Sequence, residues 1–265
     1  MILGKLKEAN RKKKNYLLYA LGEVTLIVVG ILIAIQVDAW RESENNHKKV
    51  SNYFSLMEND LADQLSEIDA QVKTELEILR DAERLIRAYN RDKRFVTDAD
   101  FSAALGNINN WRTFIKIDPT FEQLLVTGDV GLIKNEQVKK RIFSYYHQLR
   151  KVEAVVTENH QYVQSSFSPF VLRNSSHNLP NFQSNLYKTI VDLGYVPANI
   201  DQLLSDQTND NRFVQSNADR ADVKLELFNS IKFRYRIAAV HLSYLETLRA
   251  DTKKLAEEIR GAGRW

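Results

Sequence analysis

The residues of this sequence best suited to metal binding or proton transfer are its histidines, but their spacing favours neither chemistry. No histidine lies four residues from another, or beside a carboxylate at ligand spacing, so we predict no zinc site. His160 and Glu153 fall on one helix face, but two groups are too few for a metal site or a catalytic triad. The histidines are His47, His147, His160, His177 and His241.

Other catalytic patterns are also missing from the sequence. The chain has no cysteine, which excludes disulfides, thiolate metal sites and cysteine nucleophiles. No serine lies in a Gly-x-Ser-x-Gly context. The stretch Gly128–Gly131 is not followed by the lysine–serine pair of a phosphate loop, and we interpret it as a helix end plus a turn. We therefore expect neither an enzyme activity nor a cofactor.

A group of aromatic residues in the middle of the chain has two interpretations. Such side chains most often pack in the core of a helical protein. The alternative is a ligand pocket inside the helices, which leaves a small-molecule ligand as an open possibility. The group consists of Trp111, Phe114, Phe121, Tyr145, Tyr146 and Phe170.

Glu23 is the most unusual residue, because it lies inside a long apolar run. An ionisable side chain at membrane depth usually faces protein or water rather than lipid. At 100° per residue, Glu23 shares one helical stripe with small residues and a second acid, and Gly30 and Ala34 have the spacing that lets two helices approach closely. The stripe, which we interpret as a helix–helix interface, is Ala20, Glu23, Ile27, Gly30, Ala34 and Asp38. The alternatives are a Glu23 protonated or hydrated near the headgroups, or a pore-lining Glu23.

The apolar run itself predicts a transmembrane helix over residues 16–40. Twenty to twenty-five residues at 1.5 Å each span about 30–37 Å, which matches the hydrocarbon core of a bilayer. Tyr16 and Tyr19 at one end and Trp40 at the other suit the two membrane interfaces. The alternative, a cleaved signal peptide, is less favoured because the run is longer than such peptides require and contains Glu23.

The charge distribution predicts the orientation of this helix. Residues 1–15 carry six lysines and arginines against one glutamate, a charge of +5, so the other residues sum to −2 of the total of +3. The cluster Lys12, Lys13 and Lys14 therefore predicts a cytoplasmic tail (1–15), and residues 41–265 are expected in the periplasm of a bacterial inner membrane. Because the basic charge belongs to a short tail, it does not indicate nucleic-acid binding.

Two motifs resemble a family of single-pass membrane proteins of unknown function from Bacteroidetes, especially flavobacteria. Residues 16–40 read YLLYALGEVTLIVVGILIAIQVDAW, and residues 120–135 read TFEQLLVTGDVGLIKN. The family patterns are approximately Y-A-I-G-E-I-x-L-V-x-I-G-I-L-I-A-L-Q-I-N-x-W and T-Y-E-E-L-x-S-x-G-x-L-x-L-I-x-N. Phe121 replaces a tyrosine, and Asp38-Ala39 replaces Asn-x. The resemblance implies membrane placement and a helical fold, and implies no catalytic role.

The rest of the chain reads as long helices joined by short ones. Apolar residues from Phe54 to Leu79 follow an eleven-residue repeat, which predicts a straight or slightly right-handed apolar stripe on a helix that runs to about residue 90. We expect caps at Thr97, Asp118 and Asn135, a helix end at Gly128, and helices over 135–166 and 219–260. Residues 168–218 are predicted to be mainly loops, with short helices at 184–193 and 199–204. The fold class is all-α: one transmembrane helix followed by an elongated antiparallel helical bundle.

These features support three hypotheses about function. The first is a structural or docking module that forms homo-oligomers or pairs with another membrane helix through the Glu23 stripe. The second is a periplasmic ligand sensor that works through a partner, because the tail of about fifteen residues is too short for an output domain. The third is an ion- or proton-conducting oligomer that uses Glu23.

Overall fold

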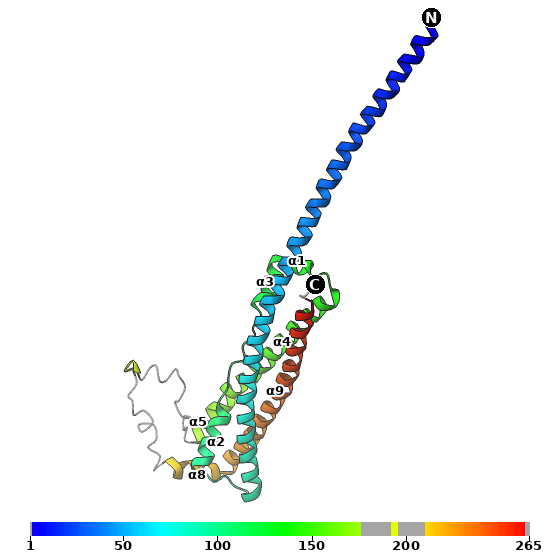
Figure 1. The fold of residues 1–265 in the computed structure, drawn as a ribbon. Helices are drawn as coiled ribbons and strands as arrows, with labels where there is room; N and C mark the ends of the chain where they lie inside the picture. The colour runs from blue at the N-terminus through cyan, green and yellow to red at the C-terminus, as the bar shows by residue number, and fades with distance from the viewer. Residues whose placement is uncertain (1, 176–191, 196–209, 263–265) are drawn as a thin grey trace.

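The computed structural model describes residues 2–175, 192–195 and 210–262, and within these ranges it is helical with no strand. The helix α1 runs unbroken from Ile2 to Asp92, a length of 91 residues or about 140 Å. No proline occurs in this stretch, so nothing interrupts its backbone hydrogen bonds. The first half projects as a free rod, and the second half packs against the other helices (Figure 1). The predicted membrane segment and the first domain helix are therefore one element.

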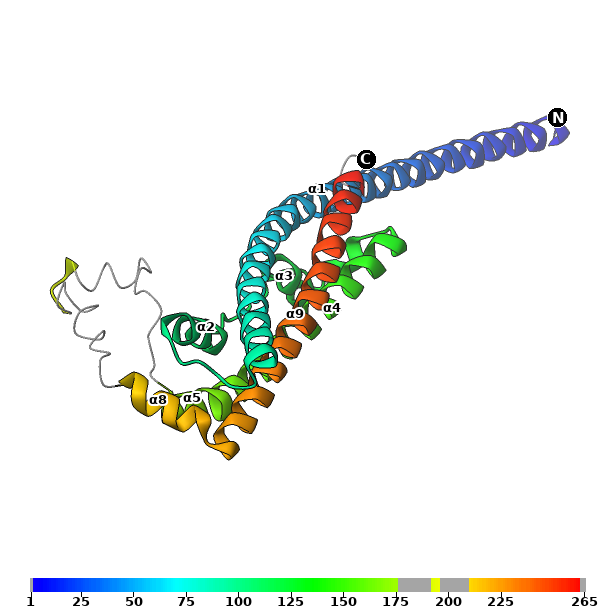
Figure 2. The same cartoon turned by 90° about the horizontal axis from the view of Figure 1, so that it is seen from below.

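Three long helices lie along one another in the packed part. The helix α4 spans Glu136–Tyr162 and α9 spans Ala221–Ala262. Ion pairs between α1 and α9 join Glu58 to Arg260 and Asp69 to Arg249, so rising numbers on α1 meet falling numbers on α9. The two helices therefore run in opposite directions. The helix α4 lies beside α9 (Figures 1 and 2).

The buried face of α1 differs from the predicted eleven-residue repeat. Its most buried residues alternate steps of four and three, which is a seven-residue repeat, and the eleven-residue repeat is wrong because it counted only apolar residues. Leu65, Leu76 and Leu79 of that repeat are only half-buried. The buried series is Met57, Leu61, Gln64, Ile68, Gln71, Glu75, Ile78, Ala82 and Leu85. A seven-residue repeat makes packed helices wind around each other, and α1 curves in its packed half (Figure 2).

The core of the packed part is divided into two apolar clusters. The cluster near the free rod includes Met57, Tyr145 and Leu255. The distal cluster includes Ile78 and Ile231. Between them, all three long helices bury polar side chains at the same level, as described below.

The segments between α1 and α4 are held by polar side chains of α1. The helix α2 spans Ala99–Asn109 and is capped by Asp98, whose carboxylate accepts from the Phe101 amide at 2.8 Å. The prediction of Thr97 as the cap is thus wrong by one residue. In the extended segment 110–118, the buried Gln64 accepts from the Ile117 amide at 2.7 Å. Burial of this polar heptad residue is tolerated because it satisfies backbone groups.

The helix α3 spans Pro119–Thr127 and ends at Gly128, whose φ of 73° is the left-handed conformation of a helix end. The prediction that Asp118 caps α3 with its side chain is wrong. The Asp118 carboxylate instead accepts a hydrogen bond from Lys116. The Thr120 amide instead donates to Asp60 of α1 at 3.0 Å. A 3₁₀ turn, η1 (Asp129–Leu132), leads to α4. As predicted, Asn135 caps α4, accepting from the amides of residues 137 and 138.

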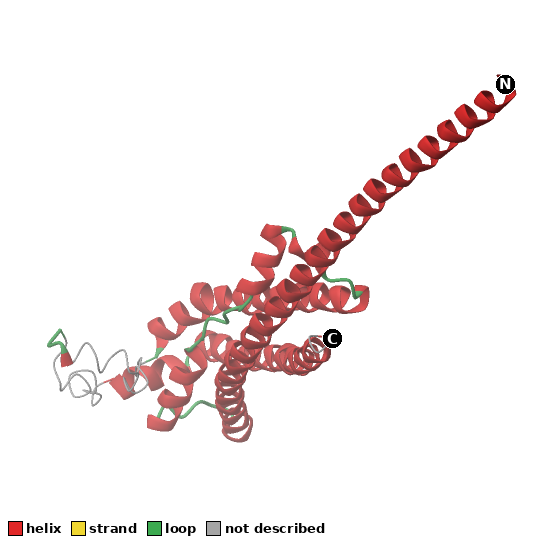
Figure 3. Cartoon of the chain, turned by 45° about the horizontal axis from the view of Figure 1, so that its top comes forward, coloured by secondary structure: helices red, strands yellow, loops and turns green. Residues whose placement is uncertain are grey.

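The helical backbone that follows α4 continues beyond residue 166, the predicted helix end. A π-helical turn, η2 (Val163–Phe167), joins it to α5 (Ser168–Asn174). The π turn comes just before Pro169, which has no amide hydrogen to donate to the helix. Such turns accommodate a local mismatch in the hydrogen bonds of a helix. A further helix, α8 (Asp210–Asp219), precedes α9, so the loops predicted for 168–174 and 210–218 are wrong (Figure 3). The short helix predicted at 199–204 and most of that at 184–193 lie outside the described residues.

Candidate functional site

Three helices bring Glu75, His160 and His241 together in the middle of the packed part. Glu75 lies on α1, His160 on α4 and His241 on α9, and one ligand atom of each lies within 4.8 Å of those of the other two. Glu75 and His241 are fully buried, and His160 is 6% exposed. Together with Gln71 and Asn159, these residues form what we call the polar layer. It separates the two apolar clusters.

Hydrogen bonds in the polar layer fix one tautomer of His241. Its Nε2 lies 3.0 Å from the Asn159 amide nitrogen, which donates, so Nε2 is the acceptor. Nδ1 therefore carries the proton and donates to Glu75 Oε1 at 2.8 Å. The Gln71 amide donates to the same oxygen at 3.0 Å. A carboxylate that accepts from one ring nitrogen of a histidine fixes both the orientation and the tautomer of the ring.

Several atoms of the polar layer have no hydrogen-bond partner within the described part of the chain. They are Gln71 Oε1, Glu75 Oε2 and His160 Nε2, and all are buried. Buried polar atoms without partners are rare in proteins because each costs about 1–3 kcal/mol. Their gathering at one level makes the polar layer the strongest candidate for a functional site.

Arg234 lies about two helical turns from His241 on α9 and is also fully buried. Its Nε donates to the Ile108 carbonyl and its Nη2 to the Asn110 carbonyl, both at 2.8 Å. These carbonyls belong to the C-terminal end of α2, where the helix dipole favours a cation. Its Nη1 has no partner among the described residues, and its charge acts on Glu75.

The surroundings of Glu75 and His160 move their pKa values in ways that suit ion binding. Burial raises the pKa of Glu75, but the hydrogen bond from His241 and the charge of Arg234 lower it by more, so the net pKa is below its ordinary value. Burial lowers the pKa of His160 to about 4. At neutral pH the polar layer therefore presents an ionised carboxylate and a neutral imidazole, the forms that bind metal ions.

Sequence spacing missed this site because its residues come from three distant helices. The structure gives His160 neighbours from α1 and α9, not the Glu153 that shares its helix face. One signal was present: Glu75 and His241 both fall on the seven-residue repeats that form the buried faces of α1 and α9. A charged residue on such a face is rarely buried without a partner.

The residues singled out in the apolar segment lie on the projecting half of α1. Described side chains between Leu21 and Trp40 are exposed, and Trp40 is 67% exposed. Glu23, Ile27, Gly30, Ala34 and Asp38 are exposed along the helix, with no contact to the described remainder of the chain. The side chains of Lys12, Lys13, Lys14, Tyr16, Tyr19 and Ala20 lie outside the part that is described.

The aromatic group is core rather than one pocket. Phe114, Phe121, Tyr145 and Tyr146 belong to the cluster near the rod, and the rings of Phe121 and Tyr146 stack at 4.2 Å. Phe170 belongs to the distal cluster, and Trp111 is 42% exposed.

The turn predicted at Gly128–Gly131 anchors the packed part to the base of the rod. Asp129 accepts from Lys49 Nζ at 2.9 Å and from the Tyr53 hydroxyl at 2.7 Å, both on α1. Those bonds lower the pKa of Asp129. We call Lys49, Tyr53 and Asp129 the base clamp.

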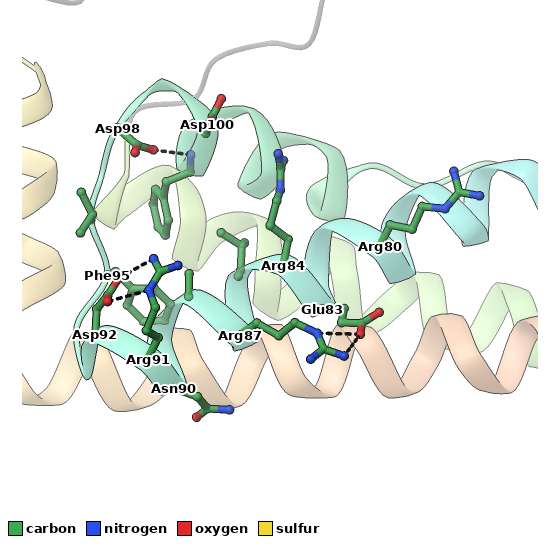
Figure 4. A pocket seen from close by; sticks show the side chains of 14 residues that line it. Arg80, Glu83, Arg84, Arg87, Asn90, Arg91, Asp92, Phe95, Asp98 and Asp100 are labelled. Carbon is green, nitrogen blue, oxygen red and sulfur yellow. Dashed lines mark hydrogen bonds and ion pairs between the residues drawn. The ribbon is translucent and has the colours of Figure 1, made fainter.

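A groove of about 980 Å³ lies at the distal end, between the last turns of α1 and the start of α2 (Figure 4). Its four arginines are matched by four acids, and three of the arginines are paired. Arg87 binds Glu83, Arg91 binds Asp92, and Arg84 binds Asp81 of the same helix. The groove therefore does not present the excess positive charge of an anion site. The eight residues are Arg80, Arg84, Arg87, Arg91, Glu83, Asp92, Asp98 and Asp100.

Comparisons with known proteins found one family model that is similar to part of the chain. Searches of curated proteins and of solved structures gave no match. A model described as a family of unknown function (DUF6090) matches residues 23–115. The match begins at Glu23 and ends in the extended segment before α3, so it includes Glu75 but not His160 or His241. It covers just over a third of the 265 residues, and the chain is similar to that family of unknown function over this stretch.

Proposed function

We propose that this chain is a single-pass protein of the bacterial inner membrane that acts as a structural or docking module. In this proposal residues 16–40 cross the bilayer, residues 1–15 lie in the cytoplasm, and residues 41–265 form an elongated antiparallel bundle in the periplasm. The resemblance of the anchor to flavobacterial single-pass proteins supports this placement, as does the lysine cluster before it.

The observation that carries the proposal is the continuity of α1. Its apolar stretch has a mean hydropathy of 2.0 over a membrane-length window and buries none of that window in the protein. Soluble proteins rarely expose such a surface. Because the same helix continues into the core, a bundle built this way stands rigidly on its anchor. The arrangement suits a spacer or docking platform better than a tethered, freely moving domain.

The stripe around Glu23 supports assembly with a second copy of the chain. Small residues and one polar group on a single face are what transmembrane helices use to pack together. The chain itself offers this face no partner in the described residues. We infer that a second α1 covers it in the membrane.

Single-cysteine crosslinking tests this assembly cleanly, because the chain contains no cysteine of its own. Ala34→Cys lies on the Glu23 stripe, and Leu32→Cys lies about 180° from Glu23 at nearly the same depth. Oxidation in native membranes is expected to give disulfide-linked dimers for Ala34→Cys and mostly monomers for Leu32→Cys. Only monomers from both variants, or equal dimers from both, would contradict the proposal.

Orientation is tested with the same cysteine-free background. A membrane-impermeant maleimide added to intact spheroplasts is expected to label Asn45→Cys and not Asn10→Cys. Permeabilised cells serve as the control, in which both positions react. Labelling of Asn10→Cys alone in intact spheroplasts would reverse the topology.

A ligand sensor is the second candidate, and the polar layer is the observation that favours it. Glu75 lies on the same unbroken helix as the anchor, so a change at Glu75 reaches the membrane without crossing a loop. The proposal predicts that occupancy of the polar layer changes the Ala34→Cys crosslinking yield. An unchanged yield with and without a bound ligand would leave only the structural role.

A further inference from the structure

We propose that Glu75, His160 and His241 form a binding site for one divalent transition-metal ion, with zinc the first ion to test. The inference concerns the polar layer alone and does not depend on the membrane topology or on the structural role proposed above.

The donor set selects the class of ion. Two imidazole nitrogens and one carboxylate oxygen are the ligands of zinc, iron, cobalt and nickel sites, whereas calcium and magnesium prefer oxygen ligands alone. Zinc sites with two histidines and one glutamate leave a fourth position for water. The Gln71 carbonyl oxygen, buried and unpartnered among the described residues, lies on the same side chain that donates to Glu75.

Unpartnered lone pairs distinguish this layer from an ordinary buried hydrogen-bond network. In such a network each polar atom meets a partner, because an unmet one is destabilising. Here Glu75 Oε2 and His160 Nε2 both lack one among the described residues, although both side chains are more than nine-tenths buried. Each is an atom that binds a cation directly. One ion shared by the three helices satisfies them together.

The buried charge sets a condition on how the ion is held. An ion of charge +2 beside one carboxylate leaves an excess positive charge, which is unfavourable in an apolar core and near Arg234. A bound water that loses one proton to solvent becomes hydroxide and balances that excess, because a zinc-bound water has a pKa near 7. Coordination through His241 Nδ1 moves the ring proton to Nε2, which then donates to the Asn159 carbonyl oxygen once that side-chain amide turns over.

Burial also decides when the ion enters. Glu75 and His241 are fully covered by the three long helices, so exchange with solvent requires the helices to separate. We therefore expect the ion to enter during folding or local opening and then to leave slowly.

The experiment uses the full chain purified in detergent, stripped by prolonged dialysis against EDTA and then dialysed against zinc chloride. Elemental analysis is expected to find one zinc per chain, and zinc is expected to raise the melting temperature by several degrees where magnesium does not. The variants His160→Gln and Glu75→Gln are expected to lose most of the bound zinc and the thermal shift. His147→Gln, an exposed histidine of the same helix α4, is the matched control and should bind as the wild type does.

A spectroscopic measurement on the unaltered chain covers the case in which a variant fails to fold. X-ray absorption of the bound zinc is expected to show two imidazole ligands and oxygen ligands, with no sulfur. No zinc retained by the wild type would overturn the proposal and assign the layer to buried water. Zinc retained equally by folded His160→Gln, or a ligand set with one imidazole or none, would overturn it as well.

Discussion

Each half of α1 contains a stretch that departs from the usual relation between polarity and burial. Between Leu21 and Trp40 the helix exposes leucine, isoleucine and valine side chains; between Gln64 and Glu75 it buries two glutamines and a glutamate completely. The same backbone carries both halves without a break. A prediction of burial from hydropathy alone therefore fails in both stretches of this helix: apolar residues are exposed in the first, and polar residues are buried in the second.

In the proposed arrangement, each half is matched to a different surrounding. Exposed apolar residues are favourable where hydrocarbon replaces water. Buried polar residues are tolerated where other side chains or backbone groups form hydrogen bonds with them, as the backbone of the segment 110–118 does with Gln64. Where the partners are incomplete, as at Glu75, the polar group points to a function. Four changes test this contrast.

Glu75→Leu is expected to have the largest effect on the buried half. It leaves His241 and Arg234 without the carboxylate that faces them, and removing one partner of a buried charged pair costs about 3–5 kcal/mol. Denaturant unfolding followed by circular dichroism measures the loss. Glu77→Leu, two residues away and exposed, is the control and should change stability by about 0.5 kcal/mol or less. Equal stability of Glu75→Leu and the wild type would show that the polar layer contributes nothing to the fold.

Acid is expected to destabilise the polar layer through His160. Burial lowers the pKa of His160 from 6.5 to about 4 in the folded chain, so the unfolded chain takes up this proton first as pH falls. The stability from neutral His160 is therefore present above pH 6.5 and lost between about 6.5 and 4, by about 3 kcal/mol in full.

Urea unfolding in EDTA at pH 7.5 and 4.5 measures this loss, with His160→Gln as the comparison because it has no imidazole to protonate. The fall in unfolding free energy should be smaller in the variant. Parallel curves for variant and wild type would show that other groups carry the acid sensitivity.

Local features of the fold were predictable from sequence because neighbouring residues determine them. Asn135 and Gly128 were correctly placed at a helix start and a helix end, since a cap acts within three residues. Asp118 was not the side-chain cap because Asp60, 58 residues earlier in the chain, reaches the Thr120 amide. The π turn before Pro169 joins α4 to α5, so the helical backbone passes residue 166, where the helix was predicted to end.

The polar layer was not predictable in the same way. The seven-residue repeat of α1 includes Gln64, Gln71 and Glu75. A repeat that counts only apolar residues assigns Leu65 and Leu76 to the buried face in their place. His160 and His241 are 81 residues apart in sequence, so no local spacing relates them. Only packing of α1, α4 and α9 brings the three side chains within reach.

At the junction between the two halves, Tyr53→Phe tests the base clamp. The change removes the hydroxyl that donates to Asp129 at 2.7 Å while keeping the ring in the core. A loss of about 1 kcal/mol in unfolding free energy is expected. Tyr235→Phe is the control, because that hydroxyl makes no hydrogen bond within the described part of the chain. A loss equal in both variants would mean that the clamp adds no stability of its own.

Glu23→Leu makes in the exposed half the same exchange as Glu75→Leu in the buried half, and should have the smallest effect. The unfolding free energy of the packed part is expected to stay unchanged, because Glu23 contacts none of its described residues. Association is expected to weaken by about 0.6 kcal/mol, or roughly threefold, since a polar contact between membrane helices contributes that much on average. Fluorescence transfer between labelled chains in liposomes measures it, with Val28→Leu, about 140° around the helix, as the control. Loss of folding in Glu23→Leu, or equal association of both variants, would contradict the contrast between the halves: one glutamate is held by its own chain, and the other by a neighbour in the membrane.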